Sequence, residues 1–350
     1  MTIPISISSP SSCTYDIVID ALPDLTFDRK VAIVTNPTIS ALHLEKLLSK
    51  IVANEIKVIT IPDGEEYKTM QTIEDILNEL FEFKFDRKSL LIAFGGGVIG
   101  DMTGFTASLY QRGVDFIQIP TTLLAQVDAS VGGKTGVNNR YGKNLIGAFY
   151  QPKAVYINPS FLSTLPKREF GAGVAEMIKM AVTFDSDFFE FLEKSDLSDE
   201  KTLAEAIAKS VAIKASVVNQ DEKEQGIRAA LNYGHTFGHV IENETKYKQY
   251  LHGEAVAIGM VMANRLAVKL GFMELSDEKR VAELLRKYNL PTSYEISDAQ
   301  NFYEHFFLDK KSFNSKIKFI LPVGIGKHVM PTNIEKSTVI DILLEFGIKR

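Results

Sequence analysis

The sequence has little cysteine, no long apolar run and no excess of basic residues. Its single cysteine, Cys13, excludes an internal disulfide and a cysteine-rich zinc site, and it favours a reducing compartment. No uncharged apolar run reaches the roughly 18 residues that a membrane-spanning helix requires. The first dozen residues lack the basic start and apolar stretch of a signal peptide. We therefore expect a cytoplasmic protein that does not contact the membrane.

The charge and composition exclude two further classes of protein. With 39 basic and 44 acidic residues the net charge is −5, which argues against nucleic acid as a partner but allows a local basic pocket for a small anion. A hydrophobic content of 45% and a charged content of 24% are ordinary globular values, so the chain is not mainly disordered. Its 350 residues suggest about two domains, at roughly 100–200 residues each.

The first half of the chain alternates short β-rich runs with helical periodicity. This alternation predicts a parallel sheet with covering helices. The expected strands are Val31–Thr35, Val58–Ile61, Leu90–Phe94 and Phe116–Ile119, and the expected helices are Ser40–Ala53, Thr69–Phe81 and Asp101–Tyr110.

From about Ser163 the periodicity is mainly helical, with one late strand at Ile317–Leu321. We expect a Rossmann-like α/β domain over residues 1–160 and a mainly helical domain over residues 161–350. The expected helices are Gly173–Thr183, Thr202–Asn219, Leu231–Glu244, Glu254–Leu270, Asp277–Tyr288 and Ile334–Phe346.

Glycine is concentrated in one region, since 11 of the 23 glycines lie between positions 95 and 147. The segment Gly95–Asp101 follows a strand and opens a helix, where glycine allows the backbone to approach a pyrophosphate at the helix N-terminus. Residues 128–147 place Lys134 and Lys143 in glycine-rich sequence that is poor helix or strand material. We interpret these segments as loops that contact anions. No glycine stands at the position that a P-loop would require before Lys134.

Three of the six histidines lie within 18 residues. His235 and His239 are four residues apart on one predicted helix, and His252 follows. Upstream, Glu176 and Lys179 share one helical face. A catalytic zinc takes three ligands from histidine and carboxylate, so His235, His239, His252 and Glu176 form the donor pool. The spacing alone favours the pair His235 and His239.

The predicted helix at Leu231–Glu244 extends a polar stripe back towards Arg228. By three- and four-residue spacing, Arg228, Asn232, His235 and His239 would share one face of a single helix. A stripe this polar is either a solvated face or one wall of a polar site.

Four long motifs make the chain similar to the 3-dehydroquinate synthase family. They are GGGVIGDMTGF, YQRGVDFIQIPTTLLAQVDASVGGKTGVN, GKNLIGAFYQP and LHGEAVAIGMVMA, together with Arg228 and the sequence NYGHTFGH. The resemblance runs from about Asp63 to Leu321. It implies conversion of 3-deoxy-D-arabino-heptulosonate 7-phosphate to 3-dehydroquinate, with NAD⁺ used catalytically and one divalent metal, zinc or cobalt. It also implies a homodimer.

The same resemblance implies a role for each matching position. It places the metal on Glu176, His235 and His252, which makes His239 a proton-handling residue and not a ligand. The implied catalytic residues are His239, Lys134, Lys179, Lys214, Asn232, Arg228 and Asp128. Implied substrate contacts are Arg112 (reaching the neighbouring subunit), Asn144 and Lys311, the last preferred over Lys310. The implied NAD contacts are Asp63, Gly64, Glu65, Glu66, Tyr67, Lys68, Gly97, Val98, Ile99, Gly100, Asp101, Thr121, Thr122, Lys134, Lys143, Phe161, Leu162, Ser163 and Thr164.

Three alternatives stay open at the level of the sequence. Another sugar-phosphate cyclase would act on a substrate without a carboxylate, which the presence of Arg228 and of the late lysine pair disfavours. A metal-dependent NAD polyol dehydrogenase would not need the phosphate-directed lysines Lys134, Lys179 and Lys214. A non-catalytic NAD- or metal-binding regulator would not need every site position filled.

Overall fold

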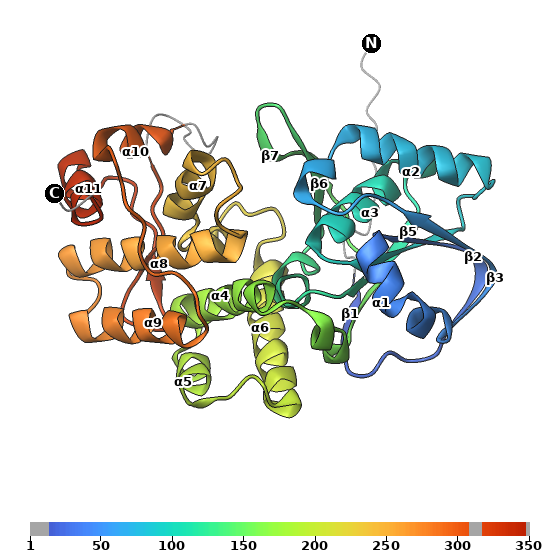
Figure 1. Cartoon of the computed structure of the whole chain (residues 1–350), viewed down its shortest axis with the longest axis horizontal. Coiled ribbons are helices and arrows are strands. Elements are labelled where there is room, and N and C mark those ends of the chain that lie inside the picture. The colour runs from blue at the N-terminus through green and yellow to red at the C-terminus, as the bar shows by residue number, and fades with distance from the viewer. Residues whose placement is uncertain (1–13, 308–316, 348–350) are drawn as a thin grey trace, which may run out of the picture.

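The chain folds into two lobes, an α/β lobe and a helical lobe (Figure 1). A computed structural model describes residues 14–307 and 317–347. In Figure 1 the blue to green α/β lobe lies on the right and the helical lobe on the left, with α4 (Lys167–Phe184) and α6 (Glu200–Gln220) towards the centre. No helix in the described ranges combines the length and apolarity needed to cross a bilayer.

Six parallel strands form the sheet of the α/β lobe, in the order β1-β8-β5-β4-β2-β3. The interior strand β4 is buried along its whole length because helices cover both faces of the sheet. This arrangement confirms the predicted fold class. The strands are β1 (Asp16–Ile19), β2 (Leu25–Thr35), β3 (Ile51–Thr60), β4 (Leu90–Gly95), β5 (Asp115–Pro120) and β8 (Ala154–Ile157).

The two faces of the sheet are covered by different elements. Leu47 and Phe161 pack with Ile33 and Ile92 on one face, whereas Ile76 and other residues of α2 and α3 pack on the opposite face. The covering elements of the first face are α1 (Pro37–Leu48) and the 3₁₀ turn η4 (Pro159–Thr164). Those of the second face are α2 (Met70–Glu82) and α3 (Gly97–Leu109), and the short turns η1 (Glu65–Tyr67) and η2 (Tyr110–Arg112) adjoin them.

The strand order reverses between β2 and β4. The chain runs outward from β2 to β3 and then crosses to β4 on the other side of β2. In parallel α/β sheets, ligands bind at such a switch point, outside the carboxyl ends of the strands. Asn36 follows β2 and Gly96 follows β4, so these residues lie where a nucleotide is expected.

The glycine-rich region after β5 is more ordered than the sequence predicts. It forms a π-helical turn η3 (Ala125–Ala129) and an antiparallel hairpin of β6 (Lys134–Asn139) and β7 (Gly142–Phe149). Gly136 and Gly147 face each other across the hairpin, and a Cβ on either would lie within 2.4 Å of backbone oxygen. The interpretation of this region as loops was therefore wrong, because glycine here permits close strand pairing.

The helical lobe begins at α4 and forms the largest apolar core of the molecule. Five of the six expected helices are present, the one expected at Leu231–Glu244 is interrupted, and α5 and α10 went unpredicted. The elements are α4 (Lys167–Phe184), α5 (Ser186–Lys194), α6 (Glu200–Gln220), η5 (Ile227–Asn232), α7 (His235–Glu244), α8 (His252–Lys269), α9 (Leu275–Lys287), α10 (Ala299–His305) and α11 (Lys336–Glu345).

Two further boundaries differ from the prediction. The helix expected at Ser40–Ala53 ends at Leu48, because Ile51 begins β3 and pairs with Leu25 of β2. The late strand is not at Ile317–Leu321 but is the short pair β9 (Leu321–Pro322) and β10 (His328–Val329). The edge strand β1 and its neighbour β8 were also missed, since each has only four residues.

The helix predicted over Leu231–Glu244 is broken at Gly234. This residue has φ +81°, a conformation that glycine adopts readily, and it separates η5 from α7. The expectation that Arg228, Asn232, His235 and His239 share one face of one helix was therefore wrong. The break allows the backbone of Gly234 to pack against α8, where an added Cβ would lie 2.8 Å from the oxygen of Val256.

A close crossing of α7 and α8 brings their histidines together. At Gly259 of α8, an added Cβ would lie 2.0 Å from the backbone oxygen of Gly234. We expect Gly259→Ala to lower the free energy of unfolding by about 1–3 kcal/mol, because overpacking must push the two helices apart. Denaturant titration measures this change, and an unfolding midpoint equal to that of the wild type would show that the crossing tolerates a methyl group.

Candidate active site

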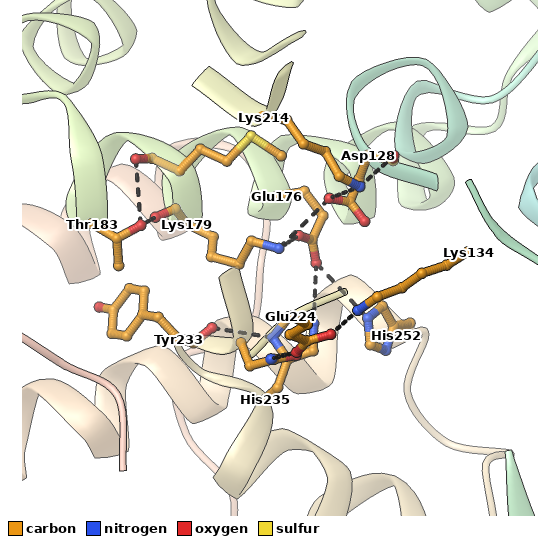
Figure 2. A network of polar contacts seen from close by, with 12 residues as sticks. Asp128, Lys134, Glu176, Lys179, Thr183, Lys214, Glu224, Tyr233, His235 and His252 are labelled. Atoms are coloured by element: carbon orange, nitrogen blue, oxygen red, sulfur yellow. Dashed lines mark hydrogen bonds and ion pairs between the residues drawn. The ribbon is translucent and has the colours of Figure 1, made fainter. Parts of the chain in front are cut away.

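Polar side chains from both lobes line one pocket between them. The α/β lobe contributes Asp128 from η3 and Lys134 from β6, and the helical lobe contributes the remaining side chains. Figure 2 shows Lys179 and Lys214 directed at Asp128, with Glu176 between Lys179 and the histidines. The complete lining is Asp128, Lys134, Lys179, Lys214, Glu224, Arg228, Leu231, Asn232 and His235.

Glu176, His235 and His252 converge from three helices. Nε2 of His235 lies 4.0 Å and Nε2 of His252 lies 3.8 Å from Oε1 of Glu176, and the three ligand atoms lie within 4.8 Å of one another. The carboxylate of Glu176 is completely buried and Oε1 accepts no hydrogen bond from any described residue. A buried carboxylate requires a compensating charge, which Lys179 supplies at Oε2 only.

A backbone carbonyl orients the ring of His235 through its outer nitrogen, Nδ1, which is the ring nitrogen that does not face Glu176. Nδ1 of His235 lies 3.2 Å from the carbonyl oxygen of Tyr233, an acceptor that favours a proton on Nδ1 and a lone pair on Nε2. This is the arrangement that metal-binding histidines ordinarily have. The orphaned oxygen of Glu176 and the direction of Nε2 therefore fit a divalent cation.

A second group of possible ligands shares His252 with the first. His239, Glu242 and His252 also place one ligand atom each within 4.8 Å of one another. The ring of His239 lies 5.4 Å from that of His235 and 6.2 Å from that of His252, measured between centroids. The structure thus places His239 beside the first group without adding it to that group.

Asp128 holds two buried lysines at the pocket. Lys214 donates to the carboxylate of Asp128 at 2.8 Å and to its backbone oxygen at 2.5 Å, and Lys179 lies 3.8 Å from the same carboxylate. Burial favours a higher pKa for Asp128, but the charges of Lys214 and Lys179 outweigh it and hold the pKa well below the usual range. Burial lowers the pKa of Lys214, which Asp128 offsets in part.

Arg228 and Asn232 reach the pocket from η5. The Arg228 guanidinium is buried, donates to the carbonyl oxygen of Gly132 at 3.1 Å, and also binds that of Glu222. Glu224 accepts from Lys134 and from Asn232, so this carboxylate neutralises part of the positive pocket. Burial lowers the pKa of Arg228, which nearby acids offset only in part.

Some of the predicted NAD residues lie on segments next to the switch point of the sheet, whereas Lys134 and Lys143 lie on the β6–β7 hairpin. Asp63 accepts from Asn36 at 2.9 Å and from Thr38 at 3.1 Å, just beyond the end of β2. Lys68 is buried and donates to both Asp101 and Asn144 at 2.5 Å. Burial raises the pKa of Asp101, although Lys68 opposes this change. The remaining residues on the same segments are Gly64, Glu65, Glu66, Tyr67, Gly97, Val98, Gly100, Thr121 and Thr122.

Several predicted residues lie in the core or away from the pocket. The side chains of Phe161, Leu162 and Ile99 are buried in apolar clusters, and the exposed Ser163 and Thr164 follow in η4. Arg112 is exposed at the far end of α3, with φ +68°, and does not line this pocket. Lys311 and the alternative Lys310 lie outside the described residues.

The sequence reasoning missed two acidic residues at the site. Glu242 lies one helical turn after His239, so the same spacing argument that selected the histidines could have found it. Glu224 lies in the bend between α6 and η5 and has φ +57°. Its position depends on how that bend folds back over the pocket, for which the sequence carries no periodic signal.

The chain is similar to known proteins along most of its length. The sequence model of the family described as "3-dehydroquinate synthase N-terminal" matches residues 58–172, and that of "3-dehydroquinate synthase C-terminal" matches residues 173–312. A 3-dehydroquinate synthase of Sulfurovum sp. (strain NBC37-1) is 70% identical over 346 residues, which cover 99% of each chain.

Two solved structures are also similar to the chain. The first is 2-epi-5-epi-valiolone synthase from Streptomyces hygroscopicus subsp. jinggangensis 5008 with NAD⁺ and Zn²⁺ bound. Its TM-score is 0.88 and its identity 27%, over 98% of this chain and 99% of that one. The second is 2-deoxy-scyllo-inosose synthase complexed with carbaglucose-6-phosphate, NAD⁺ and Co²⁺. Its TM-score is 0.80 and its identity 26%, over 91% of each chain.

Proposed function

The chain belongs to the 3-dehydroquinate synthase family, and we propose that its pocket converts 3-deoxy-D-arabino-heptulosonate 7-phosphate to 3-dehydroquinate and inorganic phosphate. One observation carries this proposal: the pocket joins four cationic side chains to a group of three metal-type ligands. A substrate with a phosphate, a carboxylate and several hydroxyls matches both parts. The reaction has no net redox change, so NAD⁺ acts as a catalyst.

Glu176, His235 and His252 would hold the metal, and the switch-point residues would hold NAD⁺. When bound, the metal supplies Lewis acidity to a substrate hydroxyl, and NAD⁺ accepts and later returns a hydride. The bound metal and cofactor of the two similar structures support this assignment for the chain.

The cationic residues bind and orient the anionic ends of the substrate. Lys179 and Lys214 are fixed by Asp128, so they meet a phosphate in a preset arrangement. The planar guanidinium of Arg228 can bind a carboxylate through two parallel hydrogen bonds. Lys134 is half exposed at the mouth of the pocket and can bind an entering anion in exchange for Glu224.

Proton transfer is assigned to His239, with Asn232 orienting a hydroxyl. The imidazole of His239 lies beside the rings of both proposed histidine ligands. A ring nitrogen in this position can take the proton of a substrate hydroxyl next to the metal and give it back. The amide of Asn232 carries both a donor and an acceptor, which suits it to hold that hydroxyl in place.

We also propose a cytoplasmic homodimer in which Arg112 reaches the phosphate end of the neighbouring site. The exposed position of Arg112 at the far end of α3, away from its own pocket, supports this assignment. Sedimentation equilibrium under assay conditions tests it, and a fully active monomer would contradict it.

A second cyclase activity is the main alternative, because the 2-epi-5-epi-valiolone synthase structure matches over 98% of the chain. We therefore expect the purified chain, with zinc or cobalt and catalytic NAD⁺, to release phosphate from 3-deoxy-D-arabino-heptulosonate 7-phosphate and to form 3-dehydroquinate without accumulating NADH. Sedoheptulose 7-phosphate, which lacks the carboxylate, is the matched control and should give little product. Turnover of the control alone would favour the other cyclase, and stoichiometric NADH from a polyol would favour a dehydrogenase.

A further inference from the structure

Glu242 is a buried carboxylate that two nitrogen atoms from other elements approach. It lies on α7 and its side chain is 3% exposed. Its Oε1 lies 3.1 Å from Nζ of Lys143 on β7 and 3.4 Å from Nδ1 of His252 at the start of α8. Helix α7, helix α8 and the β6–β7 hairpin therefore meet at one oxygen atom.

The ring of His252 lies between two carboxylates. Its Nε2 is 3.8 Å from Glu176, and its Nδ1 on the other side of the ring is 3.4 Å from Glu242. A carboxylate beside Nδ1 favours a proton there and so leaves the lone pair on Nε2. His235 obtains the same orientation from the carbonyl oxygen of Tyr233, so each of the two rings has one outer acceptor.

We propose that Glu242 is a positioning residue that fixes the ring of His252, with the proton on Nδ1, so that Nε2 is directed at Glu176 and the metal. This inference rests on the proposed function, because it takes Glu176, His235 and His252 as the ligands. Acceptors that hold the outer nitrogen of a metal-binding histidine commonly strengthen metal binding.

The charge of Glu242 suits this role. The ammonium of Lys143, 3.1 Å from Oε1, favours the ionised form of this buried carboxylate, which can only accept hydrogen bonds. Because Oε1 already faces both Lys143 and His252, Glu242 is less suited to bind the metal directly than Glu176, whose Oε1 faces the two histidines without a hydrogen bond.

Lys143 connects this carboxylate to the hairpin that carries the proposed anion contacts. Its Nζ lies 4.0 Å from the centre of the Tyr247 ring as well as 3.1 Å from Glu242. Lys143 therefore bridges from the α/β lobe to α7 of the helical lobe. Glu242 thus couples the position of His252 to that of the β6–β7 hairpin.

The test compares Co²⁺ affinity of the full-length wild type with that of Glu242→Ala and Glu242→Gln, by competition with a chelator. We expect Glu242→Ala to weaken Co²⁺ binding about 10-fold to 100-fold. Glu242→Gln keeps an acceptor but loses the charge, so it should fall between wild type and Glu242→Ala. The matched control is Glu244→Gln, on the same helix but bound to Tyr294 and His305, and it should bind as the wild type does.

Nuclear magnetic resonance of the zinc-loaded protein separates positioning from a general structural effect. The wild type and Glu242→Gln should show a slowly exchanging Nδ1–H proton of His252, which Glu242→Ala loses.

Unchanged Co²⁺ affinity in Glu242→Ala, or an equal loss of affinity in Glu244→Gln, would overturn the inference. An equal loss in His239→Ala would assign the metal to His239, Glu242 and His252 and would also overturn it. A wild type that binds no metal would overturn the proposed function itself. If Glu242→Ala does not fold, the nearly isosteric Glu242→Gln tests the inference instead. A Co²⁺ affinity below that of the wild type would support it, and an unchanged affinity would overturn it.

Discussion

The His235→Ala variant is expected to lose both its bound metal and its turnover. His235 supplies one of three converging ligand atoms, and the remaining pair, Glu176 and His252, cannot fill a three-ligand site. Lewis-acid stabilisation is worth several kcal/mol, so a loss of about 4 kcal/mol corresponds to roughly a thousandfold lower kcat/KM. Metal content after dialysis and the rate of phosphate release measure the two effects.

His239→Ala is the matched control for that variant, because it removes the same ring one helical turn away. It should keep the metal and still lose about 10²–10⁴-fold in kcat, the usual contribution of a proton-transferring side chain. The two variants would then differ in metal content, while both would have impaired turnover. Equal metal content in the two variants, with full activity in His235→Ala, would contradict the assignment of ligands.

Lys214→Met is expected to impair both stability and catalysis. The methionine has a similar length but no charge, so Asp128 would keep only Lys179, which lies 3.8 Å away. Removing one partner of a buried ion pair costs about 3–5 kcal/mol, and we expect the lower end because Asp128 retains this second lysine. Loss of a charge-assisted contact to the substrate should lower kcat/KM by roughly 10-fold to 100-fold.

The stability difference between Lys214→Met and wild type should depend on pH. In the wild type the pKa of Asp128 is lower in the folded than in the unfolded chain, so its carboxylate stabilises the fold above the unfolded value. That contribution is lost as pH falls towards the folded pKa. Lys214→Met removes the charge that lowers the pKa of Asp128 most, so this pKa is higher in the folded variant than in the folded wild type. Asp128 then contributes less to the free energy of unfolding of the variant, and less of it is lost when the pH falls. The difference in the free energy of unfolding between wild type and Lys214→Met should therefore be largest near pH 7 and smaller below about pH 4.

A surface lysine on the same helix provides the control for this prediction. Lys209 lies on α6, is 41% exposed and pairs with Glu205 at 3.5 Å. Lys209→Met should change the free energy of unfolding by less than about 1 kcal/mol, because exposed ion pairs contribute little. Denaturant titrations of both variants at pH 7 and pH 4 make the comparison. A constant difference for Lys214→Met at both pH values would contradict the role of Asp128.

Part of the fold and site could be predicted because local patterns carry that information. The buried β-rich runs and amphipathic helices of the first half specify a parallel sheet, and the helices of the second half follow from their periodicity. The long motifs also identify the family and hence the residue types at the site. Patterns of this kind could not locate the four-residue strands β1 and β8, nor distinguish a glycine-rich hairpin from a loop, because strand pairing depends on distant partners.

The sequence by itself determined the class of fold, the family and the pool of residues from which the site is built. Only the tertiary structure decided how that pool is grouped. The i, i+4 spacing of His235 and His239 suggests a ligand pair, but the break at Gly234 and the close crossing of α7 and α8 bring His235 and His252 to Glu176 of α4. Spacing along one helix describes a single surface, whereas a metal-type site and its outer acceptor Glu242 require contacts among several elements, which depend on how those elements pack.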